Sequence, residues 1–590
     1  AHDCKIYIYD VTYDETPSGS GPHLPTVKKA SLKLRTTFRK HSAVINHIDI
    51  SSEGRYMQSN CSAYELLFCD LGTGKQVTKS SQLKDVNWDT WSCTLGWPVQ
   101  GIWPKGMDGS DINAAARSHS GHLLATSDDD GQVHLFRYPV IQEGAAYLSY
   151  SGHSSHVTNV RWTAADEALI STGGADKCVF QWKHVMNEAA GEAHDADEGE
   201  DEGAGGIDAP ASVSEDVSPF MGAPSGGDES GAVKPWLGAV RAPSNPPHID
   251  HSEPAVDMSL SWVHGYTAGN RCNTRMGSNL FYSSDGEPIY PAASLGVRLS
   301  RDTANGGAFK QTYFQGHDDD ILCLAVSLDR RFVATGQTPS HTSKGMGSIC
   351  VWSADDCRLL ARMNKCHQRG VYSLAFNREG TELVSVGQDN KNTHKLWSDL
   401  GGNWSRVQCT ATATSDQSTI YFSRWLHADN PSGCQIVTGG AKAINFWKLE
   451  GATLIKKQGR FGRKYKQAPL LCAANIQAKD ERGGQTGWQT VAGTSKGDFY
   501  VFDEREVCNA VQGAHAGAVL SLAEGNQRCD FIVSGGADKH IRVWNQALQG
   551  ISNFDLTANC IVDASVASLD VRPDLTSEDE SCLQILVGSY

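Results

Sequence analysis

Several groups of His and Asp residues have side chains that could bind a metal ion. His153 and His156 are a possible metal pair, and residues 128–130 and 318–320 are runs of three Asp that could suggest calcium. Neither run belongs to a loop with the Gly and the closing Glu of a calcium-binding hand, so polar turns are the better interpretation. His153 is more consistent with a buried, hydrogen-bonded position inside a structural repeat. The sequence therefore predicts no metal site.

Catalytic and cofactor-binding motifs are not indicated either. We find no P-loop, and no pair of carboxylates in a context that suits catalysis. Four nearby Trp residues could form an aromatic cage for a cation, although packing in a core is the favoured interpretation. These residues are Trp88, Trp91, Trp97 and Trp103. We predict a protein that is not an enzyme and that needs no cofactor.

A run of basic residues is the best candidate for contact with a partner. The stretch KKQGRFGRKYK contains no acidic residue. A basic loop of this kind can attract an acidic surface and speed association with it. The alternative is a solvated loop between two structural repeats. The basic residues of the run are Lys456, Lys457, Arg460, Arg463, Lys464 and Lys466.

A repeated pattern of His, hydroxyl, Asp and Trp residues predicts the elements that position these side chains. Each copy has a His, an alternating strand, a strand of small residues with Ser or Thr, an Asp in a turn, and a strand ending in Trp. The four side chains would form a buried hydrogen-bonded network that fixes the strand register. The two predicted networks are His153, Thr172, Asp176 and Trp182, and His515, Ser534, Asp538 and Trp544.

The period and order of these copies are typical of WD repeats, in which about 40–45 residues form one four-stranded blade. Alternating strands and Gly-rich turns predict an all-β fold of tandem WD40 β-propellers, with antiparallel blades and almost no helix. The 17 Cys residues are scattered without a CxxC pair, which indicates reduced thiols. No stretch approaches about 18 apolar residues, so no membrane partner is expected.

The acidity of the chain is concentrated in one segment. The chain has 52 basic and 67 acidic residues, and 13 of the acidic residues lie between Lys183 and Lys234. Without this segment, 54 acidic residues stand against 52 basic ones, and a nucleic-acid partner is not favoured. The segment is rich in Gly, Ala, Ser and Pro, which predicts a disordered acidic linker over residues 187–252.

Stretches on both sides of this linker resemble the echinoderm microtubule-associated protein-like (EMAP-like) family. Residues 63–104, which begin AYELLFCDLGTGKQ, are similar to the atypical second propeller of that family, and so is DGSDINAAARSH. Residues 263–297, which begin VHGYTAGN, resemble the HELP motif, which in the family packs between two propellers. The blades that follow, with LVSVGQDNKNT and GAHAGAVLSL, are similar to the first propeller. This order resembles the long forms of the family, which carry several tandem units.

The linker and the resemblance together divide the chain into four predicted parts. Residues 1–186 are the C-terminal blades of an atypical WD propeller, and residues 187–252 are the linker. Residues 253–300 are the HELP-like motif, and residues 301–590 are WD blades of which the last is incomplete. We expect both rings to need chain outside this sequence, the second because it is unfinished at Tyr590.

The resemblance implies a non-catalytic cytoskeletal protein that binds tubulin or microtubules. The implied location is the cytoplasm and its cytoskeleton, or the axoneme of a cilium or flagellum, where other axonemal or cytoskeletal proteins would be further partners. The alternative is a general WD-repeat scaffold for a multiprotein complex. Generic scaffolds of that kind lack both the HELP-like stretch and the block at residues 63–104, which favours the first reading.

Overall fold

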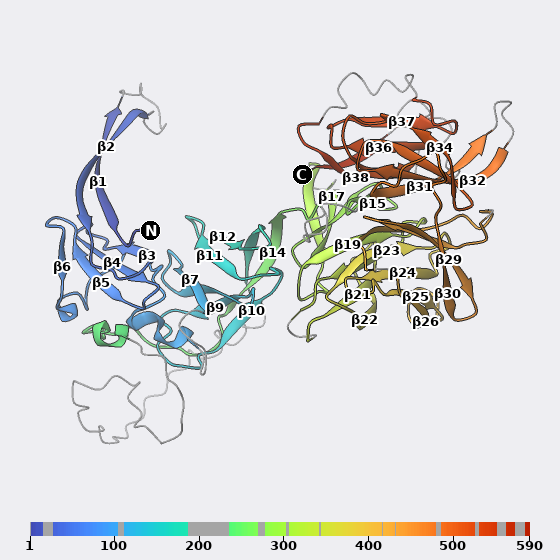
Figure 1. Ribbon diagram of the computed structural model, residues 1–590. Helices are drawn as coiled ribbons and strands as arrows, with labels where there is room; N and C mark the ends of the chain where they lie inside the picture. Colours follow the sequence, from blue (N-terminus) through green and yellow to red (C-terminus); the bar gives the residue numbers. More distant parts are fainter. Residues whose placement is uncertain are drawn as a thin grey trace, which may run out of the picture. The chain divides into compact units, whose positions relative to one another are not determined.

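The structure is a computed structural model in which the chain forms two compact units, described separately below (Figure 1). Unit 1 comprises Ala1–Tyr150, Val157–Ser171 and Gln181–Leu260, and unit 2 comprises Ser151–His156, Thr172–Phe180 and Ser261–Tyr590. The structure describes residues 2–15, 27–103, 111–186, 235–268, 278–302, 306–340, 344–415, 417–430, 432–479, 485–525, 530–550, 562–572 and 584–589.

Unit 1 contains antiparallel sheets joined by short turns. A long hairpin comes first, formed by β1 (Ile6–Glu15) and β2 (Val27–Phe38). The second sheet is β3 (Ile45–Ile50), β4 (Tyr56–Cys61), β5 (Leu66–Asp70) and β6 (Lys75–Val77). The third is β7 (Ile112–Arg117), β8 (Leu123–Asp128), β9 (Val133–Arg137) and β10 (Tyr147–Tyr150). Between them lie two short 3₁₀ helices, η1 (Ser80–Gln82) and η2 (Trp97–Ile102).

A further four-stranded sheet takes its last strand from beyond the acidic segment. Its strands are β11 (Val157–Trp162), β12 (Ala168–Gly173), β13 (Val179–Met186) and β14 (Val256–His264), in that order across the sheet. The first part of the predicted HELP-like stretch is therefore the fourth strand of a blade that begins before the linker. Tyr150 Oη donates to Asp257 Oδ1 at 2.7 Å, which ties β14 to the end of β10.

The predicted disordered linker at residues 187–252 is too long at its C-terminal end. Residues 187–234 lie outside the described residues, whereas residues 235–252 adopt a defined structure that begins with η3 (Pro235–Ala239). Trp236 is 5% exposed and belongs to the core cluster of unit 1. The Ser244 amide donates to Asp85 Oδ1 at 2.6 Å. This part of the segment can pack because its composition shifts from acidic residues to Trp, Val and Pro.

Unit 2 contains seven sheets in its described residues. The first three are β15 (Phe281–Tyr282), β16 (Pro288–Ala292), β17 (Leu295–Asp302) and β18 (Ala308–Phe314); β19 (Ile321–Val326), β20 (Phe332–Gln337), β21 (Met346–Ser353) and β22 (Leu359–Gln368); and β23 (Val371–Phe376), β24 (Glu382–Gly387), β25 (His394–Asp399) and β26 (Val407–Ala413).

The other four sheets continue the same order. They are β27 (Ile420–Trp425), β28 (Ile436–Gly440), β29 (Ile444–Glu450) and β30 (Thr453–Gln458); β31 (Leu470–Lys479), β32 (Gln485–Thr494), β33 (Phe499–Asp503) and β34 (Glu506–Val511); β35 (Val519–Glu524), β36 (Phe531–Gly536) and β37 (Ile541–Asn545); and β38 (Val566–Val571) with β39 (Ile585–Ser589). The final sheet thus has two strands within the described residues.

The seven sheets of unit 2 form a closed ring. From β19 to β38, each first strand contacts the first strand of the next sheet. The first sheet joins the ring through contacts of β16 with β19 and of β15 with β38. A cavity of about 270 Å³ is lined by residues of β19, β23, β27, β31, β35 and β38 and by the approach to β15. This cavity is the channel expected at the centre of a propeller.

Ring closure corrects two expectations from the sequence. The ring of unit 2 is not left open at Tyr590, because β15–β18 supply its first sheet. The predicted boundary between residues 300 and 301 falls inside β17, so the HELP-like stretch supplies strands instead of preceding the blades. The predicted all-β class with four-stranded antiparallel blades and almost no helix is confirmed. All six residues of β20 are buried, so this strand is covered on both faces. Its β-branched and small residues suit such a buried strand.

Candidate functional site

The basic run predicted as a contact lies on an ordered part of unit 2. Lys456 and Lys457 belong to β30, the fourth strand of its sheet, and the other basic residues follow on the way to β31. Lys457 is half-buried and the rest are exposed. We call these residues the basic ridge: Lys456, Lys457, Arg460, Arg463, Lys464 and Lys466.

Backbone and ring contacts hold the basic ridge against the neighbouring sheet. The Arg460 amide donates to the Arg505 carbonyl at 2.8 Å, and the Val507 amide donates to the Arg460 carbonyl at 3.0 Å. Phe461 packs edge-on against Tyr500, with ring centroids 5.8 Å apart. The ridge therefore presents its charges from a fixed backbone, which lowers the entropy that a partner must offset on binding.

The local partners of Arg460 and Lys464 leave the charges of both side chains at the surface. Arg460 Nη1 lies 3.0 Å from Glu506 Oε1, and both side chains are more than 60% exposed. An exposed pair of this kind is screened by solvent and contributes little to stability. Lys464 Nζ lies 5.2 Å from the ring centroid of Tyr465, a cation–π contact that keeps the ammonium at the surface.

The structure brings together all four members of the predicted network around His515. His515 Nδ1 lies 2.8 Å from Asp538 Oδ1, and His515 Nε2 lies 2.7 Å from Ser534 Oγ. The indole of Trp544 donates to the same Ser534 hydroxyl at 2.8 Å. Burial alone would raise the pKa of Asp538, but hydrogen bonds from His515 and Arg542 outweigh it and hold that pKa well below its usual range. The network ties the turn before β35 to β36 and β37.

The other predicted network contains a different hydroxyl from the one expected. His153 Nδ1 lies 2.8 Å from Asp176 Oδ2, and both side chains are buried. The Trp182 indole donates to Ser171 Oγ at 2.9 Å, where we expected the adjacent Thr172. Ser171 is fully buried in β12 and Thr172 is only half-buried, because successive side chains of a strand point to opposite faces.

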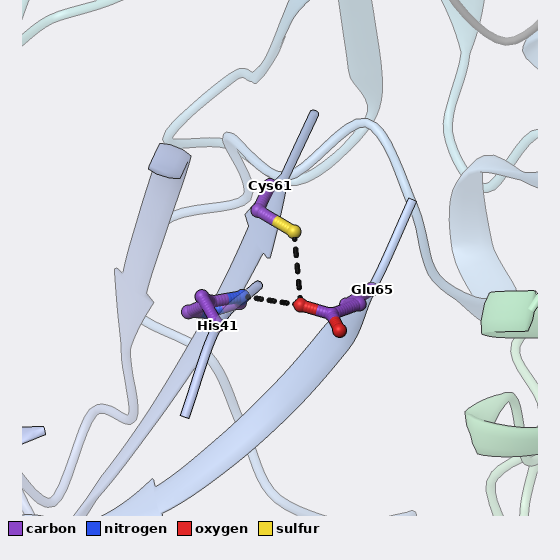
Figure 2. Close-up of side chains that lie close together, drawn as sticks. All are labelled: His41, Cys61 and Glu65. Carbon is purple, nitrogen blue, oxygen red and sulfur yellow. Dashed lines mark hydrogen bonds and ion pairs between the residues drawn. The ribbon is translucent and has the colours of Figure 1, made fainter. Parts of the chain in front are cut away.

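A third group, which sequence reasoning missed, lies in the second sheet of unit 1 (Figure 2). His41 Nε2 lies 2.7 Å from Ser59 Oγ, and His41 Nδ1 lies 3.4 Å from Glu65 Oε2. Cys61 Sγ lies 3.1 Å from the same Glu65 oxygen. His41 and Ser59 are 18 residues apart, and so are His367 and Ser385. This repeated spacing could have identified the pair of His41 and Ser59 from the sequence. The acid of this group, Glu65, stands six residues after the hydroxyl, whereas Asp538 stands four residues after Ser534.

The other candidate binding residues from the sequence are the four Trp residues and His156. Trp88, Trp91 and Trp103 belong to the core cluster of unit 1, and Trp97 begins η2. Trp88, Trp91 and Trp97 also line a cavity of about 190 Å³. His156 is exposed. One motif was missed in the sequence: GTSKG, residues 493–497, has the spacing of a nucleophile elbow. It is the turn of the β32–β33 hairpin, and a strand follows it instead of the helix that such an elbow needs.

Comparison with known proteins covers most of the chain. Family models match residues 1–184 as an echinoderm microtubule-associated protein second beta-propeller, residues 253–297 as a HELP motif, and residues 310–584 as the first beta-propeller of the same family. A second propeller therefore precedes a HELP motif and a first propeller in this chain. Among the described residues, no helix is long and apolar enough to span a membrane.

Similar proteins carry the same family names. The 77 kDa echinoderm microtubule-associated protein of Strongylocentrotus purpuratus is 45% identical over 185 residues, which are 31% of this chain and 25% of that protein. Echinoderm microtubule-associated protein-like 1 of Mus musculus is 44% identical over 185 residues, which are 31% of this chain and 21% of that protein. The match thus spans about a quarter of the length of these relatives.

Solved structures include one of U3-55K, with a TM-score of 0.37, 18% identity, and coverage of 53% of this chain and 88% of that one. The three family models match 1–184, 253–297 and 310–584, which together leave little besides the linker unmatched. The chain belongs to the echinoderm microtubule-associated protein-like family.

Proposed function

We propose that this chain is a non-catalytic protein that binds tubulin or microtubules through its propeller surfaces. The observation that carries the proposal is the family membership, since the matched relatives are named as microtubule-associated proteins. The location that follows is the cytoplasmic cytoskeleton, and we extend it to the axoneme of a cilium or flagellum, where doublets present the same tubulin lattice. Other axonemal or cytoskeletal proteins would then be neighbours on that lattice.

Charge decides how such binding can work. The chain has a net charge of -15, and tubulin is acidic, so overall attraction between the two is not available. Outside the segment between Lys183 and Lys234 the charge is nearly balanced, with 52 basic and 54 acidic residues. Binding must therefore combine shape-matched surfaces with local positive charge. The basic ridge is a local surface of this kind, held on a fixed backbone between two sheets.

The test is cosedimentation of the full chain with polymerised microtubules. We expect Lys456, Lys457, Arg463 and Lys464 changed together to Ser to weaken binding by several-fold to about tenfold, mainly through slower association. Added salt should weaken wild-type binding without abolishing it, because charges beyond about 8 Å are screened at physiological ionic strength. The variant should stay folded, since three of these side chains are exposed and Lys457 is half-buried.

A matched control removes the same number of charges elsewhere on unit 2. Lys344, Arg358, Lys365 and Arg369 are exposed basic residues around β21 and β22, and their change to Ser should leave binding near wild type. Equal binding by the ridge variant and wild type would exclude the ridge from the interface. Failure of the wild-type chain to bind either microtubules or soluble tubulin would contradict the proposed function and favour a general WD-repeat scaffold.

A further inference from the structure

In the blades of His515 and His367, one position in the network is Gly. Two residues after the network hydroxyl stand Gly536 and Gly387. A Cβ built on Gly536 would lie 2.4 Å from both His515 Nδ1 and Asp538 Oδ1, and one on Gly387 would lie 2.4 Å from His367 Nδ1. Such distances are far inside van der Waals contact. The space beside the His Nδ1 atom therefore has no room for a side chain in these blades.

Two other blades have a side chain at this position. In the blade of His317 it is Gln337, whose Oε1 lies 2.6 Å from His317 Nδ1, and in the blade of His41 it is Cys61. Cys61 stands two residues after Ser59, at the position of Gly536, and its side chain enters the space beside His41 Nδ1 (Figure 2). The acid comes from Glu65, six residues after Ser59, which has a longer side chain than Asp538. His41 Nδ1 is buried and lies 3.4 Å from Glu65 Oε2 without forming a hydrogen bond, whereas His515 Nδ1 lies 2.8 Å from an acid oxygen. His367 Nδ1 is likewise buried without a hydrogen bond to the described residues.

We propose that His41, Cys61 and Glu65 bind one divalent transition-metal ion of the zinc type, which takes the place of the 3.4 Å contact between His41 Nδ1 and Glu65 Oε2. The three ligand atoms are His41 Nδ1, Cys61 Sγ and one Glu65 carboxylate oxygen, and they all lie within 4.8 Å of one another. Imidazole, thiolate and carboxylate are the ligand types that zinc takes in proteins. The proposal is independent of the microtubule function proposed above.

Two of the three separations between ligand atoms are close to those of a tetrahedral zinc site. Zinc bonds of about 2.3 Å to sulfur and 2.0–2.1 Å to nitrogen or oxygen place neighbouring ligand atoms about 3.3–3.5 Å apart. The observed separations are 3.4 Å from His41 Nδ1 to Glu65 Oε2 and 3.1 Å from Cys61 Sγ to the same oxygen. The third pair of ligand atoms, His41 Nδ1 and Cys61 Sγ, lies within 4.8 Å.

Surrounding groups already orient the ligands. His41 Nε2 lies 2.7 Å from Ser59 Oγ, the kind of outer hydrogen bond that fixes a metal-binding imidazole. The Ser42 amide and hydroxyl both donate to Glu65 at 2.9 Å. The Glu65 side chain is 27% exposed, which gives the ion a path in and lets water supply the fourth ligand. On binding, the sulfur–hydrogen bond of Cys61 is exchanged for a sulfur–metal bond and the proton passes to solvent.

Titration of the full chain with Co²⁺ tests the site, because cobalt bound to a thiolate has a charge-transfer band in the near ultraviolet. The parent protein carries Cys409→Ser and Cys508→Ser, since these two thiols are exposed. We expect one equivalent of Co²⁺ to produce the band and Zn²⁺ to displace it. Cys61→Gly should abolish the band, and Glu65→Gln should weaken Co²⁺ binding by about tenfold or more.

Two controls separate metal binding from folding. Cys61→Gly should remain folded, because Gly is the residue at this position in the blades of His515 and His367, and Zn²⁺ should raise the melting temperature of the parent but not of this variant. Cys69→Ala removes a buried thiol of the same sheet that lies outside the cluster, and it should retain the band. A parent protein without the band at millimolar Co²⁺, or a Cys61→Gly variant with the full band, would overturn the proposal.

Discussion

Buried His side chains that bond a hydroxyl through one ring nitrogen and an acid through the other connect separate strands of a blade. His515 links the turn before β35 to Ser534 in β36 and to Asp538 in the turn that follows. The pattern stabilises one strand register because any slip would leave a buried polar atom unpaired. The side chains of His515 and Asp538 are at most 7% exposed, so we expect these residues to stabilise the blade and not to contact a partner.

Replacement of either network member tests that framework role. We expect His515→Ala and Asp538→Ala each to lower the free energy of unfolding by about 2–4 kcal/mol, because each leaves a buried partner without its hydrogen bond. Thermal or denaturant unfolding measures the loss. Asp503→Ala, at an exposed position of β33, is the control and should change stability by less than about 0.5 kcal/mol. A variant that kept wild-type stability but lost microtubule binding would instead mark a contact residue.

At the residue scale, spacing predicted some members of the networks and missed others. His515, Ser534, Asp538 and Trp544 follow from offsets that repeat along the chain. Offsets alone could not separate Ser171 from Thr172, because a shift of one residue moves the hydroxyl to the other face of the strand. Glu65 was not predicted as the acid of its network, because it stands six residues after the hydroxyl instead of four. Its side chain, longer than that of Asp, still reaches His41.

At the scale of strands and sheets, unit 2 buries neutral imidazoles in several successive blades. Burial lowers the pKa of His317 to about 4, that of His367 to about 3 and that of His394 to about 4. His317 lies before β19, His367 is in β22 and His394 is in β25. In the unfolded chain each would titrate near its ordinary value of about 6.5. The folded sheets therefore bind fewer protons than the unfolded chain between these values.

The stability of these sheets should fall on acidification. Because the unfolded state binds more protons, the free energy of unfolding decreases as pH falls below about 6.5, and each His contributes a loss of about 2 kcal/mol between about pH 7 and about pH 5. Denaturant unfolding of the chain at the two pH values measures this. His317→Gln should reduce the acid loss by about that amount, whereas His264→Gln, at an exposed position, should not. An unchanged pH dependence in His317→Gln would contradict the argument.

The blades were predictable at this scale, and their boundaries were less so. Alternating strands and tight turns predicted four-stranded sheets, which the structure contains. The sequence did not reveal that β14, after the acidic segment, completes a sheet begun before it, because strand pairing across about 70 residues leaves no local pattern. The defined structure of residues 235–252 was also not predictable, because it depends on the packing of Trp236 into the core cluster of unit 1.

At the scale of the molecule, one cluster closes the ring of unit 2. Arg330 forms a bidentate salt bridge with Asp570, with distances of 2.6 Å from Nη1 to Oδ2 and 3.0 Å from Nη2 to Oδ1. The Tyr282 amide donates to Asp570 Oδ2 at 2.8 Å, and Tyr266 Oη donates to Ser568 Oγ at 2.9 Å. These contacts join the last sheet to the first two. Sequence reasoning placed the ring's start too late and so expected no such closure.

Breaking the Arg330–Asp570 pair should therefore open the ring locally. Both side chains are at most 15% exposed, and Arg330→Ala would leave the Asp570 carboxylate largely buried without its counter-charge. We expect a loss of about 3–5 kcal/mol in the free energy of unfolding, with faster hydrogen exchange first in β15 and β38. The adjacent Arg331 is the matched control, since its pair with Asp329 is exposed and Arg331→Ala should lose less than about 1 kcal/mol. Equal exchange in β38 for the two variants would mean that apolar packing closes the ring without this pair.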